Sequence, residues 1–213
     1  SPQFTKPPPH ILCIGEDAMI NYGAIGTDTD STGGLSDSLA YQWAYPEKSG
    51  GSAITYTGQY DYDKPIYFWG FPNDLLPFPR GIHLDKYNGN INFRPMKIEQ
   101  TVMVLKVSEY RNGSKIGEIT RDIHVIVINC PNNHSPVLSG PFFKVAYENQ
   151  PQSFTINSND YDPNDSLTIS WNNSIPGAVW SDNNNQVKKP TGTLTWTPGF
   201  NTASPYPYSF VLT

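Results

Sequence analysis

The sequence has little charge and no concentration of either sign. Only 15% of the residues are charged, and the net charge is −5; an average soluble domain carries about 25% charged residues. Because no basic cluster is present, we expect neither nucleic acid nor an anionic membrane as a partner. No run of about 18 apolar residues occurs either, so we expect no membrane insertion by this segment.

Helical periodicity is nearly absent, and short runs rich in β-branched and aromatic residues stand in its place. The clearest strands are expected at 101–110 and 115–128, joined by a hairpin turn at Asn112-Gly113. Further strands are expected at 153–156, 167–171, 193–197 and 208–212. Many short strands with frequent turns predict an all-β fold made of β-sandwiches.

An internal repeat divides the chain. The spacing from Asp37-Ser38-Leu39 to Trp43 recurs from Asp165-Ser166-Leu167 to Trp171, and Gly89–Pro95 (GNINFRP) matches Gly192–Pro198 (GTLTWTP). Each repeat is expected to be an Ig-like or cadherin-like sandwich. The predicted order is a linker from a preceding repeat (1–10), a first repeat (11–130) with an aromatic-rich insertion near 50–80, a linker (131–136) and a second repeat (137–213) cut short before its last strand.

Acidic loops recur at matching places in the two repeats. Asp28 and Asp30 follow Glu16 at the distance at which Asp160 and Asp162 follow Glu148. Oxygens at alternate loop positions can converge on Ca²⁺, which takes about six to eight of them; ordinary Asx turns are the alternative. The residues expected to contribute to calcium binding are Glu16, Asp28, Asp30, Asp37, Asn132, Asn133, Glu148, Asp160, Asp162 and Asp165.

Two cysteines stand at the two ends of the first repeat. The first and last strands of an Ig-like sandwich are often neighbours, so a Cys13–Cys130 disulfide is expected, which indicates a secreted protein. The alternative is a pair of buried thiols, because Val145 occupies the equivalent place in the second repeat.

Motifs of catalysis are missing. The sequence contains no HExxH, P-loop, GxGxxG or GxSxG pattern, and we expect no enzyme. The insertion is rich in aromatic side chains, which stack on sugars or anchor protein contacts when exposed. The candidates for such a ligand platform are Tyr60, Tyr62, Tyr67 and Trp69; the alternative is that these side chains pack the insertion onto its own sandwich.

Residues 129–136 (NCPNNHSP) and the GTLTWTP segment resemble the tandem repeats of giant cell-surface adhesins of gliding Bacteroidota. The resemblance implies type IX secretion, display at the cell surface, and a role in attachment and gliding motility. The partners would be neighbouring repeats and a surface glycan or other substratum. Ser38 and Ser166 look like O-glycosylation acceptors of that phylum, because each lies between an Asp and an apolar residue; ordinary turn chemistry of Asp-Ser before a strand is the alternative.

A weaker resemblance links the chain to cadherins. Glu16, Asp160 and Asp162 match the early Glu and the Asp-x-Asp loop of that family, and Asn132-Asn133 approximates its linker. The linker Asp and the mid-domain Asp-Arg-Glu are missing, so a three-ion junction is in question. The sequence thus favours a segment of a long surface adhesin, with a carbohydrate-binding module of a secreted glycan-degrading protein as the alternative.

Overall fold

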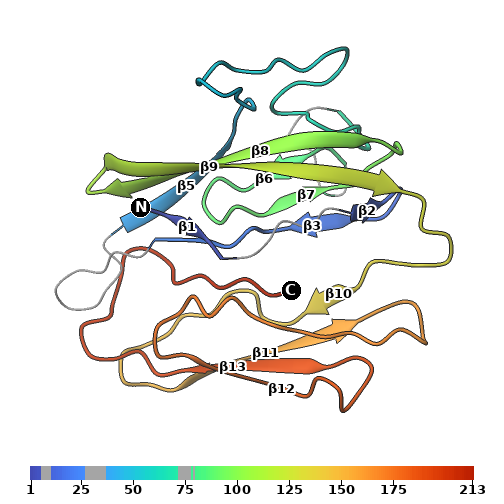
Figure 1. Ribbon diagram of the computed structural model, residues 1–213. Coiled ribbons are helices and arrows are strands. Elements are labelled where there is room, and N and C mark those ends of the chain that lie inside the picture. The colour runs from blue at the N-terminus through green and yellow to red at the C-terminus, as the bar shows by residue number, and fades with distance from the viewer. Residues whose placement is uncertain (6–10, 27–36, 72–77, 79) are drawn as a thin grey trace. The chain divides into compact units, whose positions relative to one another are not determined.

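A computed structural model describes residues 1–5, 11–26, 37–71, 78 and 80–213. The described residues form strands and loops only, which confirms the all-β prediction (Figure 1). Within them, no helix has the length and apolar character that a membrane crossing needs. The chain divides into two compact units. Unit 1 is Ser1–Thr27 with Ser38–Pro131, and unit 2 is Asp28–Asp37 with Asn132–Thr213.

Unit 1 contains a sheet in the order β2-β9-β8-β5 and a second sheet in the order β3-β7-β6. These are the C-F-G and B-E-D strand orders of an immunoglobulin sandwich, with β2 added beside the last strand. The strand bounds are β2 Ile11–Cys13, β3 Ala18–Ile20, β5 Asp37–Trp43, β6 His83–Leu84, β7 Ile91–Phe93, β8 Gln100–Arg111 and β9 Ser114–Ile128.

The long hairpin of β8 and β9 forms as the sequence predicts. Asn112 and Gly113 both adopt positive φ, 50° and 78°, which a two-residue hairpin turn of the favoured twist requires. On β9, Ile123, Val125 and Val127 alternate into the interior and are fully or almost fully buried. On β8, the core is formed by Met103, Leu105 and Val107, while Val104 is buried outside that cluster.

The chain that follows β5 makes two hydrogen bonds to the backbone of β8. Tyr56, in the connection between β5 and β6, donates its hydroxyl to the Val102 carbonyl over 2.7 Å, and Ala44 N–H donates to the Val104 carbonyl over 3.0 Å. The Tyr56 bond therefore anchors the insertion to this strand.

The segment expected to be a linker at 1–10 begins as part of unit 1. Strand β1 (Gln3–Phe4) pairs antiparallel with β4 (Ala24–Ile25), and Phe4 packs against the core. The linker prediction is therefore wrong for residues 1–5. The free energy gained by burying an apolar side chain against a core outweighs the conformational entropy that a free linker would keep.

Unit 2 contains a sheet in the order β10-β11-β13-β12, which is the A-B-E-D order of the same sandwich. Segments 167–171 and 208–212, both predicted as strands, meet through one isolated bridge between Trp171 and Leu212. Ser170 and Thr213 exchange two backbone hydrogen bonds of 2.7 and 2.9 Å. The strand bounds are β10 Val137–Ser139, β11 Gln152–Asn159, β12 Val179–Asp182 and β13 Thr191–Trp196.

The repeated glycine has a packing reason in both units. A Cβ on Gly89 would lie 2.5 Å from the Tyr41 ring, and a Cβ on Gly192 would lie 2.0 Å from the Trp180 ring. Two residues further on, Ile91 and Leu194 are completely buried. The repeated sequence thus places an aromatic ring over the glycine and an aliphatic side chain in the core.

Candidate functional site

The first candidate site is the joint at which the chain enters and leaves the sandwich of unit 1. Strand β2 runs parallel to the end of β9, with Ile11 opposite Ile126 and Cys13 opposite Ile128. Cys13 and Cys130 form the predicted disulfide, with their Cα atoms 5.5 Å apart. Beyond the cysteine, Ile14 N–H donates to the Ile128 carbonyl over 2.9 Å. Hydrogen bonds and a covalent bond therefore hold the same two strand ends together.

The disulfide encloses nearly the whole interior of unit 1. All buried members of its core lie between the two cysteines, from Ala18 to Val127. Among the described residues that are partly buried and pack on this core, only Phe4 and Leu12 lie outside the closed loop. The disulfide therefore divides unit 1 into a short N-terminal segment, residues 1–12, and a covalently closed loop that contains the buried core of the sandwich.

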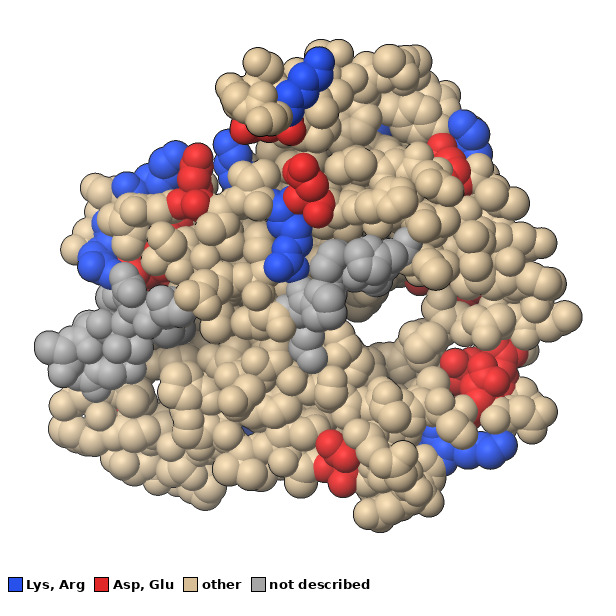
Figure 2. Space-filling view, in the orientation of Figure 1, with Lys and Arg blue, Asp and Glu red and all other residues tan. Residues whose placement is uncertain are grey.

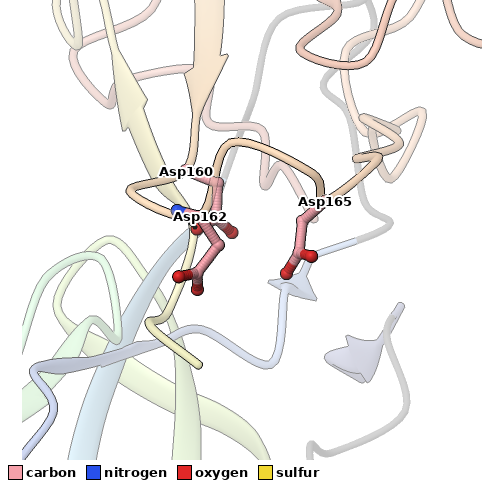
Figure 3. Close-up of side chains that lie close together, drawn as sticks. All are labelled: Asp160, Asp162 and Asp165. Carbon is pink, nitrogen blue, oxygen red and sulfur yellow. Dashed lines mark hydrogen bonds between the residues drawn. The ribbon is translucent and has the colours of Figure 1, made fainter. Parts of the chain in front are cut away.

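The second candidate site is an acidic loop in unit 2, where Asp160, Asp162 and Asp165 come together (Figure 3). One carboxylate oxygen from each residue lies within 4.8 Å of the others, and Asp160 is 3% exposed. The loop follows β11 directly, so the sheet fixes the position of its first residue. The arrangement supplies three carboxylates of the oxygen-rich set that Ca²⁺ prefers.

Hydrogen bonds already occupy part of this acidic loop. Asp162 accepts from the His134 N–H at 2.7 Å and lies 3.2 Å from His134 Nδ1, and its own N–H donates to Asp160 Oδ1 over 2.9 Å. The backbone hydrogen bond from His134 is the largest of the causes that lower the pKa of Asp162. These contacts favour the ionised form of Asp162 and fix its orientation, both of which ion binding requires. They also occupy carboxylate oxygens that a bound cation would use.

Two lysines lie at the same loop. Lys189 Nζ donates to the Asp160 carbonyl, and Lys188 Nζ donates to the Asn164 carbonyl over 3.2 Å. Ammonium groups offset part of the carboxylate repulsion that a bound cation would otherwise remove. The loop is therefore a candidate calcium site whose negative charge is partly offset by Lys188 and Lys189.

The other residues expected to bind calcium are placed differently. Glu148 accepts a hydrogen bond of 3.0 Å from the Ala203 N–H, and Asn132 is exposed with a positive φ of 60°. Asn133 donates to the His134 carbonyl over 3.4 Å. Asp37 is 8% exposed at the start of β5, and Glu16 lies in the turn after β2. Asp28 and Asp30 fall outside the described residues.

The aromatic side chains of the insertion contact one another and β8. Tyr45 packs on Tyr62, with ring centroids 4.7 Å apart, and donates its hydroxyl to Asp61 over 2.8 Å. Tyr60 donates to Glu99, whose other oxygen accepts the Tyr67 N–H over 2.7 Å. These contacts hold the insertion in place. For Tyr60 and Tyr62 they favour the interpretation that the side chains pack the insertion onto its own sandwich.

Trp69, the one tryptophan in the sequence of the insertion, is 41% exposed, but cations lie close to its ring. The guanidinium carbons of Arg94 and Arg80 lie 5.1 and 5.7 Å from the ring centroid, within the cation–π range. Arg94 also pairs with Asp17 over 2.6 Å, which raises the pKa of the arginine. The ring is therefore part of a charged cluster, and neighbouring Tyr67 is 43% exposed.

Glu109 is a buried acid that the sequence reasoning missed. It is 1% exposed on β8, and its Oε1 has no hydrogen-bond partner among the described residues. The backbone nitrogen of Ser1 lies 3.5 Å from Oε2. Cβ atoms on Gly26 and Gly117 would lie only 3.1 and 3.4 Å from its oxygens, so glycines make room for the carboxyl. A charged residue at the end of an apolar strand was the only signal.

The surface agrees with the low charge of the sequence. On the face shown in Figure 2, basic and acidic side chains occur in small separate groups and uncharged residues cover most of the area. In unit 2, a stretch after β10 exposes Phe142, Phe143, Val145 and Tyr147 to between 57 and 77%.

No protein-family model matches the chain, and a search of curated proteins also finds no match. Solved structures that align with it include Dpr2 Ig1-Ig2 in complex with DIP-Theta Ig1-Ig3 (12% identity, 95% of this chain, 87% of that chain, TM-score 0.29). Others are a chimeric titin Z1Z2-Z1Z2 tandem (13%, 93%, 85%, TM-score 0.29) and Rst D1-D2 (11%, 99%, 96%, TM-score 0.31). At these scores the likeness carries no argument, and the fold assignment rests on the strand order described above.

Proposed function

We propose that this chain is an extracellular, load-bearing segment of a long repetitive cell-surface adhesin. The observation that carries the proposal is the joint of unit 1, where parallel strands β2 and β9 and the Cys13–Cys130 disulfide hold the two ends of one sandwich together. Disulfides persist in oxidising environments outside the cytosol, which fits the cell surface. The segment is not proposed to catalyse a reaction.

The direction of the β2–β9 pair suits a part under tension. The chain approaches β2 at Ile11 and leaves β9 at Ile128, and parallel strands place these two points at opposite ends of the paired segment. If the disulfide were open, tension along the chain would slide the strands past each other and load their hydrogen bonds together; with it closed, the Cys13–Cys130 bond carries the pull. Tension that peeled the strands apart would load the bonds one at a time, so the observed arrangement resists a larger pull.

The finer identity of the adhesin rests on the sequence motifs. Residues 129–136 and the GTLTWTP segment support an origin among the gliding adhesins of Bacteroidota, with type IX secretion, neighbouring repeats as partners and a glycan or other substratum as the target. Ser38 and Ser166 are proposed as O-glycosylation acceptors, and Ser166 is exposed. Mass spectrometry of protein from the native host tests this point, and unmodified peptides at both serines would contradict it.

Calcium binding at Asp160, Asp162 and Asp165 is the proposed cofactor chemistry of the segment. A cation bound there would add to the stability of unit 2, because a ligand that binds only the folded state stabilises it by mass action. Removal of calcium from the purified protein should then lower the midpoint of the unit 2 transition.

The proposal is tested in the native host by replacing residues 1–213, in frame, with a flexible Gly/Ser segment of equal residue number. Gly/Ser chains are random coils, so the covalent connection is kept while the folded structure is lost. Cells that carry the replacement should detach at a lower wall shear stress. Equal detachment, with equal surface abundance shown by a tag on the same protein, would contradict a load-bearing role.

The carbohydrate-binding module remains the second candidate, because Tyr67 and Trp69 are both more than 40% exposed. Aromatic side chains at this exposure are available to stack on sugars or to anchor a protein contact. A glycan array probed with the whole chain distinguishes the two functions. Binding that a Trp69→Ala variant loses, while Trp171→Ala keeps it, would favour the module.

A further inference from the structure

The position of the disulfide determines which part of the chain tension can reach. Tension that arrives from residues 1–12 passes through Cys13 to Cys130 and continues into residues 131–213. The sequence separation of the two cysteines is 117 residues, and the chain between them forms a closed loop beside this path. A closed loop attached at one point carries no tension along its length.

We propose that the Cys13–Cys130 disulfide takes the sandwich of unit 1 out of the load path and makes it a length reserve that is released only on reduction. The inference rests on the proposed load-bearing function for its use, but the mechanical property belongs to the chain itself. With the bond closed, β1 and β2 are the paired strands of unit 1 under load among the described residues. Their release from β4 and β9 can lengthen the chain by at most about 40 Å, the fully extended span of 12 residues at ~3.3–3.6 Å each.

Opening the bond changes the available length about tenfold. Reduction puts the 117 residues from Cys13 to Cys130 into the load path, where they span about 400 Å when fully extended. The Cα atoms of the two cysteines are only 5.5 Å apart in the folded unit, so nearly all of that length is new. A tether that is short while oxidised therefore becomes long and yielding when reduced.

The release needs a thiol reductant. A thiolate of the reductant attacks one sulfur of the bond and forms a mixed disulfide, and the other cysteine leaves as a thiolate and takes up a proton. A second thiol of the reductant then displaces the remaining cysteine, so that two thiols become one disulfide while Cys13 and Cys130 become thiols. Both cysteines are half-buried. Release of β2 from β9 under load would expose them further.

Single-molecule force spectroscopy on the whole chain, held by covalent tags at its two ends, tests the proposal. In oxidising buffer, unit 1 should contribute no extension step longer than that of its first 12 residues. Addition of dithiothreitol under constant load should produce one further step of about 400 Å per molecule. Residues 132–213 of unit 2 lie outside the closed loop and contain no cysteine, so their unfolding step should be the same in both buffers and serves as the internal reference.

The matched control is the double variant Cys13→Ser/Cys130→Ser, which should show the long step without any reductant. Near-ultraviolet circular dichroism of this variant first establishes that unit 1 still folds; if it does not, reduction of the folded wild-type protein under load decides alone. A long step in the oxidised wild-type protein would overturn the proposal, and so would the absence of a new step after reduction. Neither result depends on whether host cells use the segment for attachment.

Discussion

Removal of the disulfide should destabilise unit 1 and leave unit 2 unchanged. In the chain-entropy model, a bond that closes a loop of 117 residues lowers the entropy of the unfolded chain by an amount worth about 4.9 kcal/mol at 25 °C. This figure is an upper limit, because measured disulfides often contribute less. Unfolding of about 120 residues has an entropy of ~0.25 kcal/mol per degree, so the melting midpoint of unit 1 should fall by up to about 19 °C.

Differential scanning calorimetry of the wild-type protein and of Cys13→Ser/Cys130→Ser measures this effect. Unit 2 contains no cysteine, so its transition is a reference within the same molecule. Tryptophan fluorescence separates the two units further, because a Trp171→Phe/Trp180→Phe/Trp196→Phe background leaves emission only from unit 1. An unchanged unit 1 midpoint, or an equal fall in both transitions, would refute the reasoning that the bond acts by closing unit 1.

Three further predictions concern unit 2. Calcium should raise its melting midpoint relative to EDTA, and Asp165→Asn should reduce that rise; equal midpoints in calcium and EDTA would count against the site. Gly192→Ala should lower the free energy of unfolding by about 1–3 kcal/mol in urea titrations, because its Cβ would lie 2.0 Å from the Trp180 ring. Gly199→Ala, whose Cβ would have its nearest contact at 3.6 Å, should change that free energy little. Equal effects of the two substitutions would contradict this packing. The pKa of Asp162 is held below its ordinary value of 3.8, so its contribution to the stability of unit 2 is complete above that pH and is lost as the pH falls below it. In an acid titration, Asp162→Asn should therefore lose less stability than the wild-type protein. An identical acid profile would contradict the assigned role.

The sequence was most informative where local backbone chemistry and burial agree. Asn112-Gly113 lies between two β-rich runs, and the turn, both long strands and the buried face of β9 follow from that pattern. The repeated glycine also marked equivalent strands, β7 and β13, because the need for a ring-sized space recurs with the fold. These features depend on residues close in the sequence, which explains why they could be predicted.

Features that depend on distant contacts were predicted less well. Phe4 lies in an apparent linker but packs, partly buried, against the core of unit 1, and periodicity cannot reveal a two-residue strand. The buried carboxyl of Glu109 depends on space left by Gly26 and Gly117, which lie on other segments. Of the predicted calcium ligands, the aspartates of one loop came together, while Glu148 bonds to the Ala203 N–H. The spacing of residues in a sequence shows neither which hydrogen bonds compete for a carboxylate nor how much room the fold leaves for a side chain.

The central claim is that this segment works outside the cell with its disulfide closed, and the state of Cys13 and Cys130 in intact host cells tests it most directly. Living cells would be treated with a membrane-impermeant alkylating reagent and then with protease, and the released peptides analysed by mass spectrometry without reduction. The account predicts that peptides from both units are released from intact cells, with Cys13 and Cys130 linked and unalkylated. Peptides that appear only after lysis, with both cysteines recovered as free thiols, would contradict it.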